Sequence, residues 1–131
     1  MLERLHQLET NIGELEKFKD QYSVADLNKN LQTRWILRYG IFESIQIVID
    51  IACHLTAKYN LGNPQNYSEC IKLLVEHEYL SGQLGDTLTG MTGLRNILIH
   101  EYVAVDNKRL FSLLDKLEDF NSFADAVKDL I

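Results

Sequence analysis

Four polar side chains that could do chemistry lie close together in this sequence: Arg95, Asn96, His100 and Tyr102. They stand among apolar residues in the segment GLRNILIHEYVAVD, residues 93–106. An arginine can grip a phosphate through paired hydrogen bonds and stabilise the charge of a transition state. A histidine titrates near neutral pH and can move a proton to or from an oxygen. With the 2′-hydroxyl of RNA as nucleophile, this set could cut RNA without a metal.

A straight helix does not bring the arginine and the histidine of this segment together. Asn96 and His100 are four positions apart and share a helix face. Arg95 and His100 are five apart, which separates them by about 140° around the axis and roughly 7.5 Å along it. Convergence requires a distorted helix end, or a second copy across a two-fold axis. Without further context, a buried histidine at a helix end is the commoner explanation.

Apolar residues recur at helical spacing along almost the whole chain, and no strand pattern competes with them. The clearest loop surrounds the single proline, Pro64. The sequence therefore predicts an all-α, up-and-down bundle of four main helices plus a short one, as one domain over residues 1–131. The expected helices cover residues 1–20, 23–59, 68–80, 83–101 and 106–131.

Local signals mark the ends of these helices. Ser23, with Asp26 three residues later, predicts a variant of the capping box. Ser68 is expected to cap the short helix and Asp106 the last one. A strip of small residues in the fourth helix would let another helix approach closely; its members are Gly85, Thr89 and Gly93.

The second expected helix is apolar almost all the way round between Trp35 and Ala52. A surface helix in a bundle of this size should keep one polar face. Two explanations remain open at this point. Either a partner chain covers one side of the helix, or the helix is central and the other helices surround it.

The net charge of −6 argues against a protein coated in nucleic acid. The acidic surplus is uneven, however. Residues 27–60 and residues 91–109 carry more basic than acidic side chains, whereas the rest of the chain is acidic. This distribution leaves room for a local RNA-binding groove. Arg34 and Arg38, four apart on the second helix, are either ordinary surface charges or contacts to the RNA backbone.

Two cysteines, Cys53 and Cys70, are too few for a disulfide framework, and we expect reduced thiols in the core. Asp50 and His54 share a helix face, and an internal hydrogen bond is favoured there over a metal site. No metal or other cofactor is expected. The first residues lack the apolar run of a signal peptide, and polar residues interrupt the apolar region 39–57. A cytoplasmic protein without a membrane span is therefore expected.

The segment from Arg95 to Tyr102 resembles the signature of the HEPN superfamily, which is an arginine, a polar residue, a short spacer and a histidine. It is more closely similar to the HepT-type toxins, whose motif extends to His-x-Tyr, and the likeness covers roughly residues 27–125. The resemblance implies a dimeric all-α bundle with two motifs in a shared cleft and metal-independent RNase activity. Arg95 and His100 would be catalytic, with Asn96 as the accompanying polar residue.

The same resemblance implies a partner. Members of the family commonly pair with a small MNT-type nucleotidyltransferase, an antitoxin that adds AMP groups to the motif tyrosine, here Tyr102. Transfer RNA is a target within the family. Glu101 departs from the small residue often found at its position, and its role is open. Two other functions stay in view: a non-catalytic helical subunit that presents substrate or nucleotide to a nucleotidyltransferase, and a purely structural interaction protein.

Overall fold

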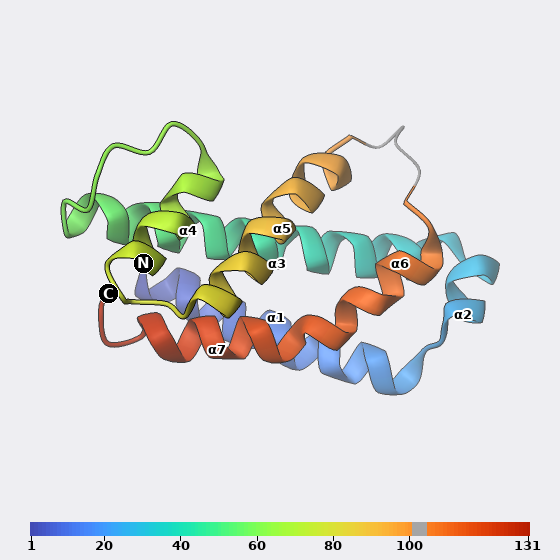
Figure 1. The fold of residues 1–131 in the computed structure, drawn as a ribbon. Helices are drawn as coiled ribbons and strands as arrows, with labels where there is room; N and C mark the ends of the chain where they lie inside the picture. The colour runs from blue at the N-terminus through green and yellow to red at the C-terminus, as the bar shows by residue number, and fades with distance from the viewer. Residues whose placement is uncertain (101–104) are drawn as a thin grey trace.

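The chain forms an up-and-down bundle of helices in a computed structural model that describes residues 1–100 and 105–131 (Figure 1). No strand occurs among these residues, so the all-α prediction is confirmed. Three long helices and a segmented last one run back and forth, joined by short elements. The elements are α1 (Leu2–Gln21), α2 (Val24–Lys29), α3 (Leu31–Lys58), α4 (Tyr67–Glu76), α5 (Gly82–Leu98), α6 (Asn107–Ser112), the 3₁₀ turn η1 (Leu113–Lys116) and α7 (Leu117–Val127).

The helix predicted over residues 23–59 is interrupted at Asn30, which separates the short α2 from the long α3. Asn30 has an extended backbone, with φ −131° and ψ 110°. Its side-chain oxygen accepts hydrogen bonds from the backbone N–H groups of Gln32 (2.9 Å) and Thr33 (3.2 Å). Asparagine favours such local bonds over helix continuation, and here they cap α3. The predicted cap of the preceding helix is confirmed, because Asp26 accepts from the backbone N–H of Ser23 at 2.7 Å.

The other helix ends differ from the predictions by a few residues. Asn66 rather than Ser68 caps α4, because its side-chain oxygen accepts from the N–H of Glu69 at 3.0 Å. Asp106 caps α6 as predicted, accepting from the N–H of Lys108 at 3.0 Å. The difference that matters for function is that α5 ends at Leu98, before the histidine of the motif.

The two halves of the apolar α3 differ in how they are covered. Its second half is central, and side chains such as Ile47 and Ile49 are buried by the other helices of the same chain. Its first half leaves four large apolar side chains more than half exposed: Leu31, Trp35, Ile36 and Tyr39. The bundle therefore accounts for one half of the pattern and presents the other half at the surface.

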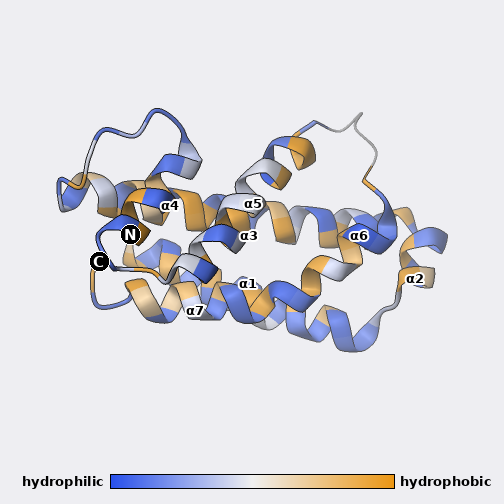
Figure 2. Ribbon diagram, in the orientation of Figure 1, coloured by the Kyte–Doolittle hydropathy of each residue, from blue (hydrophilic) through white to orange (hydrophobic). Residues whose placement is uncertain are grey.

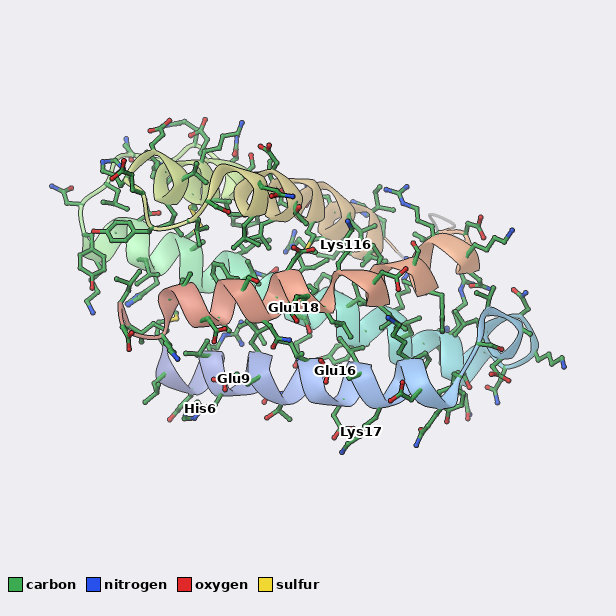
Figure 3. All side chains as sticks on the ribbon, turned by 60° about the horizontal axis from the view of Figure 1, so that its bottom comes forward. His6, Glu9, Glu16, Lys17, Lys116 and Glu118 are labelled. Atoms are coloured by element: carbon green, nitrogen blue, oxygen red, sulfur yellow. A yellow bond between two sulfur atoms is a disulfide. The ribbon has the colours of Figure 1, made fainter. Side chains whose placement is uncertain are left out.

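The face formed by α1 and α7 has a different character. Charged side chains such as Glu9, Lys17 and Glu118 project from these two helices (Figure 3). Hydrophilic and hydrophobic residues alternate along both helices (Figure 2). Their apolar stripes, which include Leu8 and Phe123, are fully buried in the core. This side of the bundle is thus a solvated, charged surface.

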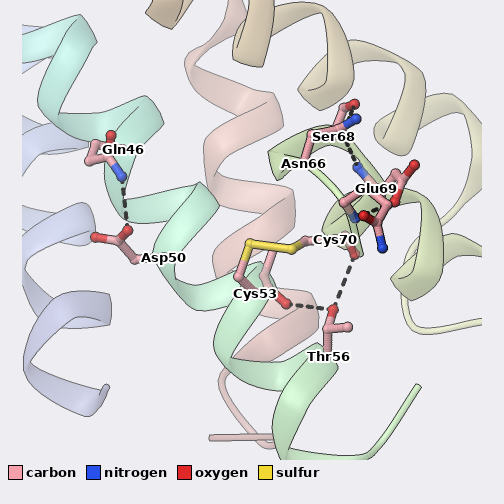
Figure 4. The surroundings of a disulfide bond; sticks show 10 residues. Gln46, Asp50, Cys53, Thr56, Asn66, Ser68, Glu69 and Cys70 are labelled. Atoms are coloured by element: carbon pink, nitrogen blue, oxygen red, sulfur yellow. Dashed lines mark hydrogen bonds between the residues drawn. A yellow bond between two sulfur atoms is a disulfide. The ribbon is translucent and has the colours of Figure 1, made fainter. Parts of the chain in front are cut away.

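The two cysteines do not remain reduced thiols, because Cys53 of α3 and Cys70 of α4 form a disulfide bond (Figure 4). The loop after α3 turns the chain back so that the first turns of α4 pack beside the end of α3. Thr56 adds a second link, since its hydroxyl donates to the carbonyl of Cys70 at 3.3 Å. The prediction of reduced thiols was wrong because two cysteines 17 residues apart in the sequence give no sign that the loop brings them together.

Only part of the small-residue strip in α5 serves helix packing. A Cβ atom at Gly85 would overlap the side chain of Val75 in α4, whereas a Cβ at Gly93 would meet nothing within 4 Å. Gly85→Ala is therefore expected to destabilise the fold by about 1–3 kcal/mol, because valine is stiff and cannot yield easily.

Gly90→Ala is the matched control, because Gly90 also lies within α5 and has open space around it. It is expected to stabilise the helix by up to about 1 kcal/mol through helix propensity. Urea unfolding of both variants measures the difference, and equal free energies of unfolding would contradict this account of α5 packing.

Candidate functional site

Arg95 lies near the end of α5 and is held by side chains from four other positions. Its Nε donates to the Oε1 atom of Gln46 in α3 at 2.7 Å, and its Nη1 donates to Oδ1 of Asn96 at 3.2 Å. The guanidinium carbon also lies 5.7 Å from the ring centre of Phe42 and 5.3 Å from that of Tyr67. Cation–π contacts of this kind favour a fixed cation. The arginine is therefore oriented before any ligand arrives.

His100 lies just after α5, where the helix has already ended. The N–H of Ile99 still donates to the carbonyl of Arg95, four residues earlier, at 3.1 Å. The N–H of His100 instead donates to the carbonyl of Ile97, three residues earlier, at 3.3 Å. This tighter turn ends the regular helix. The regular helix has therefore ended before His100, while convergence of the Arg95 and His100 side chains stays a prediction. The side chain of His100 is exposed.

Arg34 and Arg38 bind the backbone on either side of this turn. Nη2 of Arg38 donates to the carbonyl of Leu98 at 3.3 Å and to that of His100 at 3.1 Å. Nη2 of Arg34 donates to the carbonyl of Val105 at 3.1 Å. The last carbonyls of a helix lack internal partners and attract cations. Both arginines thus have structural partners, while their contact with RNA stays a prediction.

Two motif residues, Glu101 and Tyr102, lie outside the described residues, so nothing is said of their geometry. Asn96 is exposed beside Arg95. Asp50 and His54, weighed as an internal pair, are not brought together by any described hydrogen bond. Asp50 instead forms an ion pair with Arg4 and accepts from Gln46 at 2.8 Å, and His54 is exposed.

Three side chains that contact Arg95 carry no signal in the sequence analysis: Phe42, Gln46 and Tyr67. The spacing offered one clue for α3, because Trp35, Tyr39, Phe42 and Gln46 follow each other at intervals of four, three and four residues. Residues at this spacing lie on one helix face.

Glu43 lies on the same helix and is held in its charged form. A hydrogen bond from the hydroxyl of Tyr39 is the main cause that lowers the pKa of Glu43, and a bond from Asn11 and the charge of Arg4 add to it. The same contact raises the pKa of Tyr39. An exposed apolar stripe therefore borders a stable negative charge on α3.

Neither a metal cluster nor a membrane span emerges from the described part of the chain. No group of three or more His, Cys, Asp and Glu side chains there is placed to hold a metal ion. None of the helices within residues 1–100 and 105–131 is both long and apolar enough to cross a bilayer.

Arg38→Ala is expected to lower the rate of any reaction at this site by about tenfold, because it releases the backbone that carries His100. The hydrogen exchange of the amides of residues 97–100 should become faster, while the salt dependence of RNA binding should stay the same. Arg109→Ala removes an equal charge from the exposed surface of α6 and is the control. A reduced salt slope with unchanged exchange would instead make Arg38 an RNA contact.

Taken together, the helical bundle, the oriented arginine and the histidine after the helix end define a protein of the HEPN class. The chain matches the family model described as ribonuclease HepT-like over residues 8–127. It belongs to the HepT-like ribonuclease family, which confirms the resemblance seen in the motif.

Individual relatives agree with this assignment. The chain is 30% identical over 118 residues to an mRNA nuclease HepT of Shewanella oneidensis, covering 88% of this chain and 81% of that protein. It is 27% identical over 108 residues to a tRNA nuclease HepT of Aphanizomenon flos-aquae, covering 82% and 73%. Its fold matches the tri-AMPylated Shewanella oneidensis HEPN toxin, solved in complex with an MNT antitoxin, with a TM-score of 0.88 at 24% identity. That match covers 98% of this chain and 96% of the toxin chain.

Proposed function

We propose that this chain is a metal-independent endoribonuclease toxin that works in the cytoplasm and is silenced by an MNT-type nucleotidyltransferase antitoxin. The observation that carries the proposal is an arginine oriented by Gln46 and two aromatic rings, one turn before an exposed histidine. The names of two relatives, an mRNA nuclease and a tRNA nuclease, support RNA as the substrate. Transfer RNA is therefore one candidate substrate among cellular RNAs.

The chemistry requires only the RNA and the side chains. His100 of one copy takes the proton from a 2′-hydroxyl, whose oxygen then attacks the adjacent phosphorus. The bond from phosphorus to the 5′-oxygen breaks, and this oxygen takes a proton from a second histidine. The products are a 2′,3′-cyclic phosphate and a 5′-hydroxyl. Arg95 stabilises the extra negative charge on the phosphorane, and Asn96 helps to orient the phosphate.

The need for both an acid and a base is met by two copies of the chain. The exposed side chains of Trp35 and Tyr39 lie on the same α3 face as Phe42 and Gln46, which contact Arg95. A second copy that covers the exposed half of this face is therefore brought next to the arginine. A two-fold dimer applies the same patch to itself, so each copy places its motif beside that of its partner.

Silencing follows from the position of Tyr102, two residues after His100. The antitoxin transfers AMP from ATP to the tyrosine oxygen and releases pyrophosphate. Each added phosphate brings negative charge and bulk next to the catalytic pair, which repels RNA and fills the site. The AMPylated state of the structurally similar Shewanella oneidensis toxin supports this mode of control.

Two measurements on the purified chain test the proposal. Incubation with RNA in EDTA should yield fragments that end in a 2′,3′-cyclic phosphate. Incubation with ATP, magnesium and an MNT-type nucleotidyltransferase should add AMP to the wild type and stop cleavage, whereas Tyr102→Phe should gain no mass and stay active. Full cleavage by an AMPylated protein would refute the proposed control.

A further inference from the structure

A connected row of side chains links α1 to the arginine of the site. The guanidinium of Arg4 in α1 forms an ion pair with the carboxylate of Asp50 in α3. The Nε2 group of Gln46 donates to the Oδ1 atom of Asp50 at 2.8 Å (Figure 4). The Oε1 atom of Gln46 then accepts from Nε of Arg95 at 2.7 Å. Gln46 thus connects the Arg4–Asp50 ion pair to Arg95 through two hydrogen bonds.

The orientation of the Gln46 amide is chemically forced. The carboxylate of Asp50 can only accept, and the guanidinium of Arg95 can only donate. A flipped amide would place its NH₂ group against Nε–H and its oxygen against the carboxylate, so both hydrogen bonds would be lost. Asp50 therefore fixes which end of the amide faces Arg95, and Arg4 in turn balances the charge of Asp50.

The acceptor that faces Arg95 is neutral, and this has an electrostatic consequence. A carboxylate in the same place would form an ion pair with the guanidinium and compete with a phosphate for it. An amide oxygen also orients the guanidinium through this hydrogen bond, and it leaves the positive charge of the guanidinium uncompensated. We infer that Gln46 is a positioning residue that orients Arg95 through a neutral acceptor and reserves its charge for the RNA phosphate. This inference rests on the proposed function.

Two variants separate orientation from charge. Gln46→Met keeps the length of the side chain and removes both hydrogen bonds, so cleavage should slow by about tenfold while the salt dependence of RNA binding stays unchanged. Gln46→Glu combined with Asp50→Asn keeps the net charge of the chain but moves a carboxylate onto Arg95. The slope of log affinity against log salt should then become shallower by about 0.7, the value for one phosphate contact on a single strand.

The matched control is Gln83→Glu combined with Asp86→Asn, the same exchange at two exposed positions of α5. It should leave cleavage and the salt slope at the wild-type values. The melting temperature of each variant is measured beside its activity, so that loss of folded protein is recognised.

A direct readout of the arginine makes the test independent of cleavage. The NMR signal of the Arg95 Nε–H should be protected from solvent exchange in the wild type and should exchange faster in Gln46→Met. Unchanged exchange in that variant overturns the positioning role, and a wild-type salt slope in the Gln46/Asp50 double variant overturns the charge argument. If the wild type cleaves no RNA while Nε–H exchange responds to Gln46→Met, the proposed function fails and the positioning stands.

Discussion

Arg95→Ala and His100→Ala are each expected to lower the rate of RNA cleavage by about 10²–10⁴-fold. The arginine variant loses the cation that stabilises the phosphorane, and the histidine variant loses proton transfer. Neither change should unfold the chain, because Arg95 is only half-buried and His100 is exposed. The measurement is the initial cleavage rate at equal concentrations of folded protein.

His54→Ala and Arg109→Ala are the controls for these two variants, since both remove the same side-chain type from an exposed position on another part of the bundle. They should cleave at the wild-type rate. Equal cleavage rates for His100→Ala and His54→Ala would show that His100 takes no part in the reaction. The non-catalytic alternative, a subunit that serves a nucleotidyltransferase, would then gain support.

Trp35→Glu is expected to convert the proposed dimer into monomers and to reduce cleavage at least a hundredfold. Trp35 is 58% exposed in the single chain, at the centre of the apolar half of α3. Burial of an unpaired carboxylate costs several kcal/mol, and the change occurs twice in a two-fold interface.

Leu2→Glu tests whether this effect belongs to the α3 face. Leu2 is an apolar residue with 55% exposure at the start of α1, close to the exposure of Trp35. Its variant should keep the dimer mass in sedimentation experiments and the wild-type cleavage rate. A dimer that survives Trp35→Glu with full activity would place the interface elsewhere.

The sequence was sufficient for those features that depend on local spacing. Apolar residues at helical intervals predicted the bundle, and the caps at Ser23 and Asp106 were found because their signals are contained within a few residues. Asn30 shows where such reasoning fails. An asparagine in an otherwise unbroken helical pattern is compatible with a continuous helix or with a cap, and only packing decides between them.

The site residues also fall into two groups, those that local sequence patterns predict and those that only the tertiary structure brings together. Arg95 and His100 stand out because their motif is compact, and a family resemblance added weight to it. Gln46 lies 49 positions before Arg95, and Arg38 lies 62 before His100, so no local pattern connects them. The disulfide between Cys53 and Cys70 was missed for the same reason. These contacts exist because α4 and α5 fold back onto α3, which is a property of the tertiary structure.

The most direct test of the account uses two matched RNA strands in EDTA, one of them with a single 2′-deoxy sugar at the site where the other is cut. We predict that the wild type cuts the all-RNA strand, leaves a 2′,3′-cyclic phosphate, and spares the deoxy position. We also predict that Arg95→Ala and His100→Ala cut the all-RNA strand at that site at least about a hundredfold more slowly than the wild type. Cleavage at the deoxy position, or cleavage of the RNA strand only after a metal is added, would contradict the metal-independent mechanism.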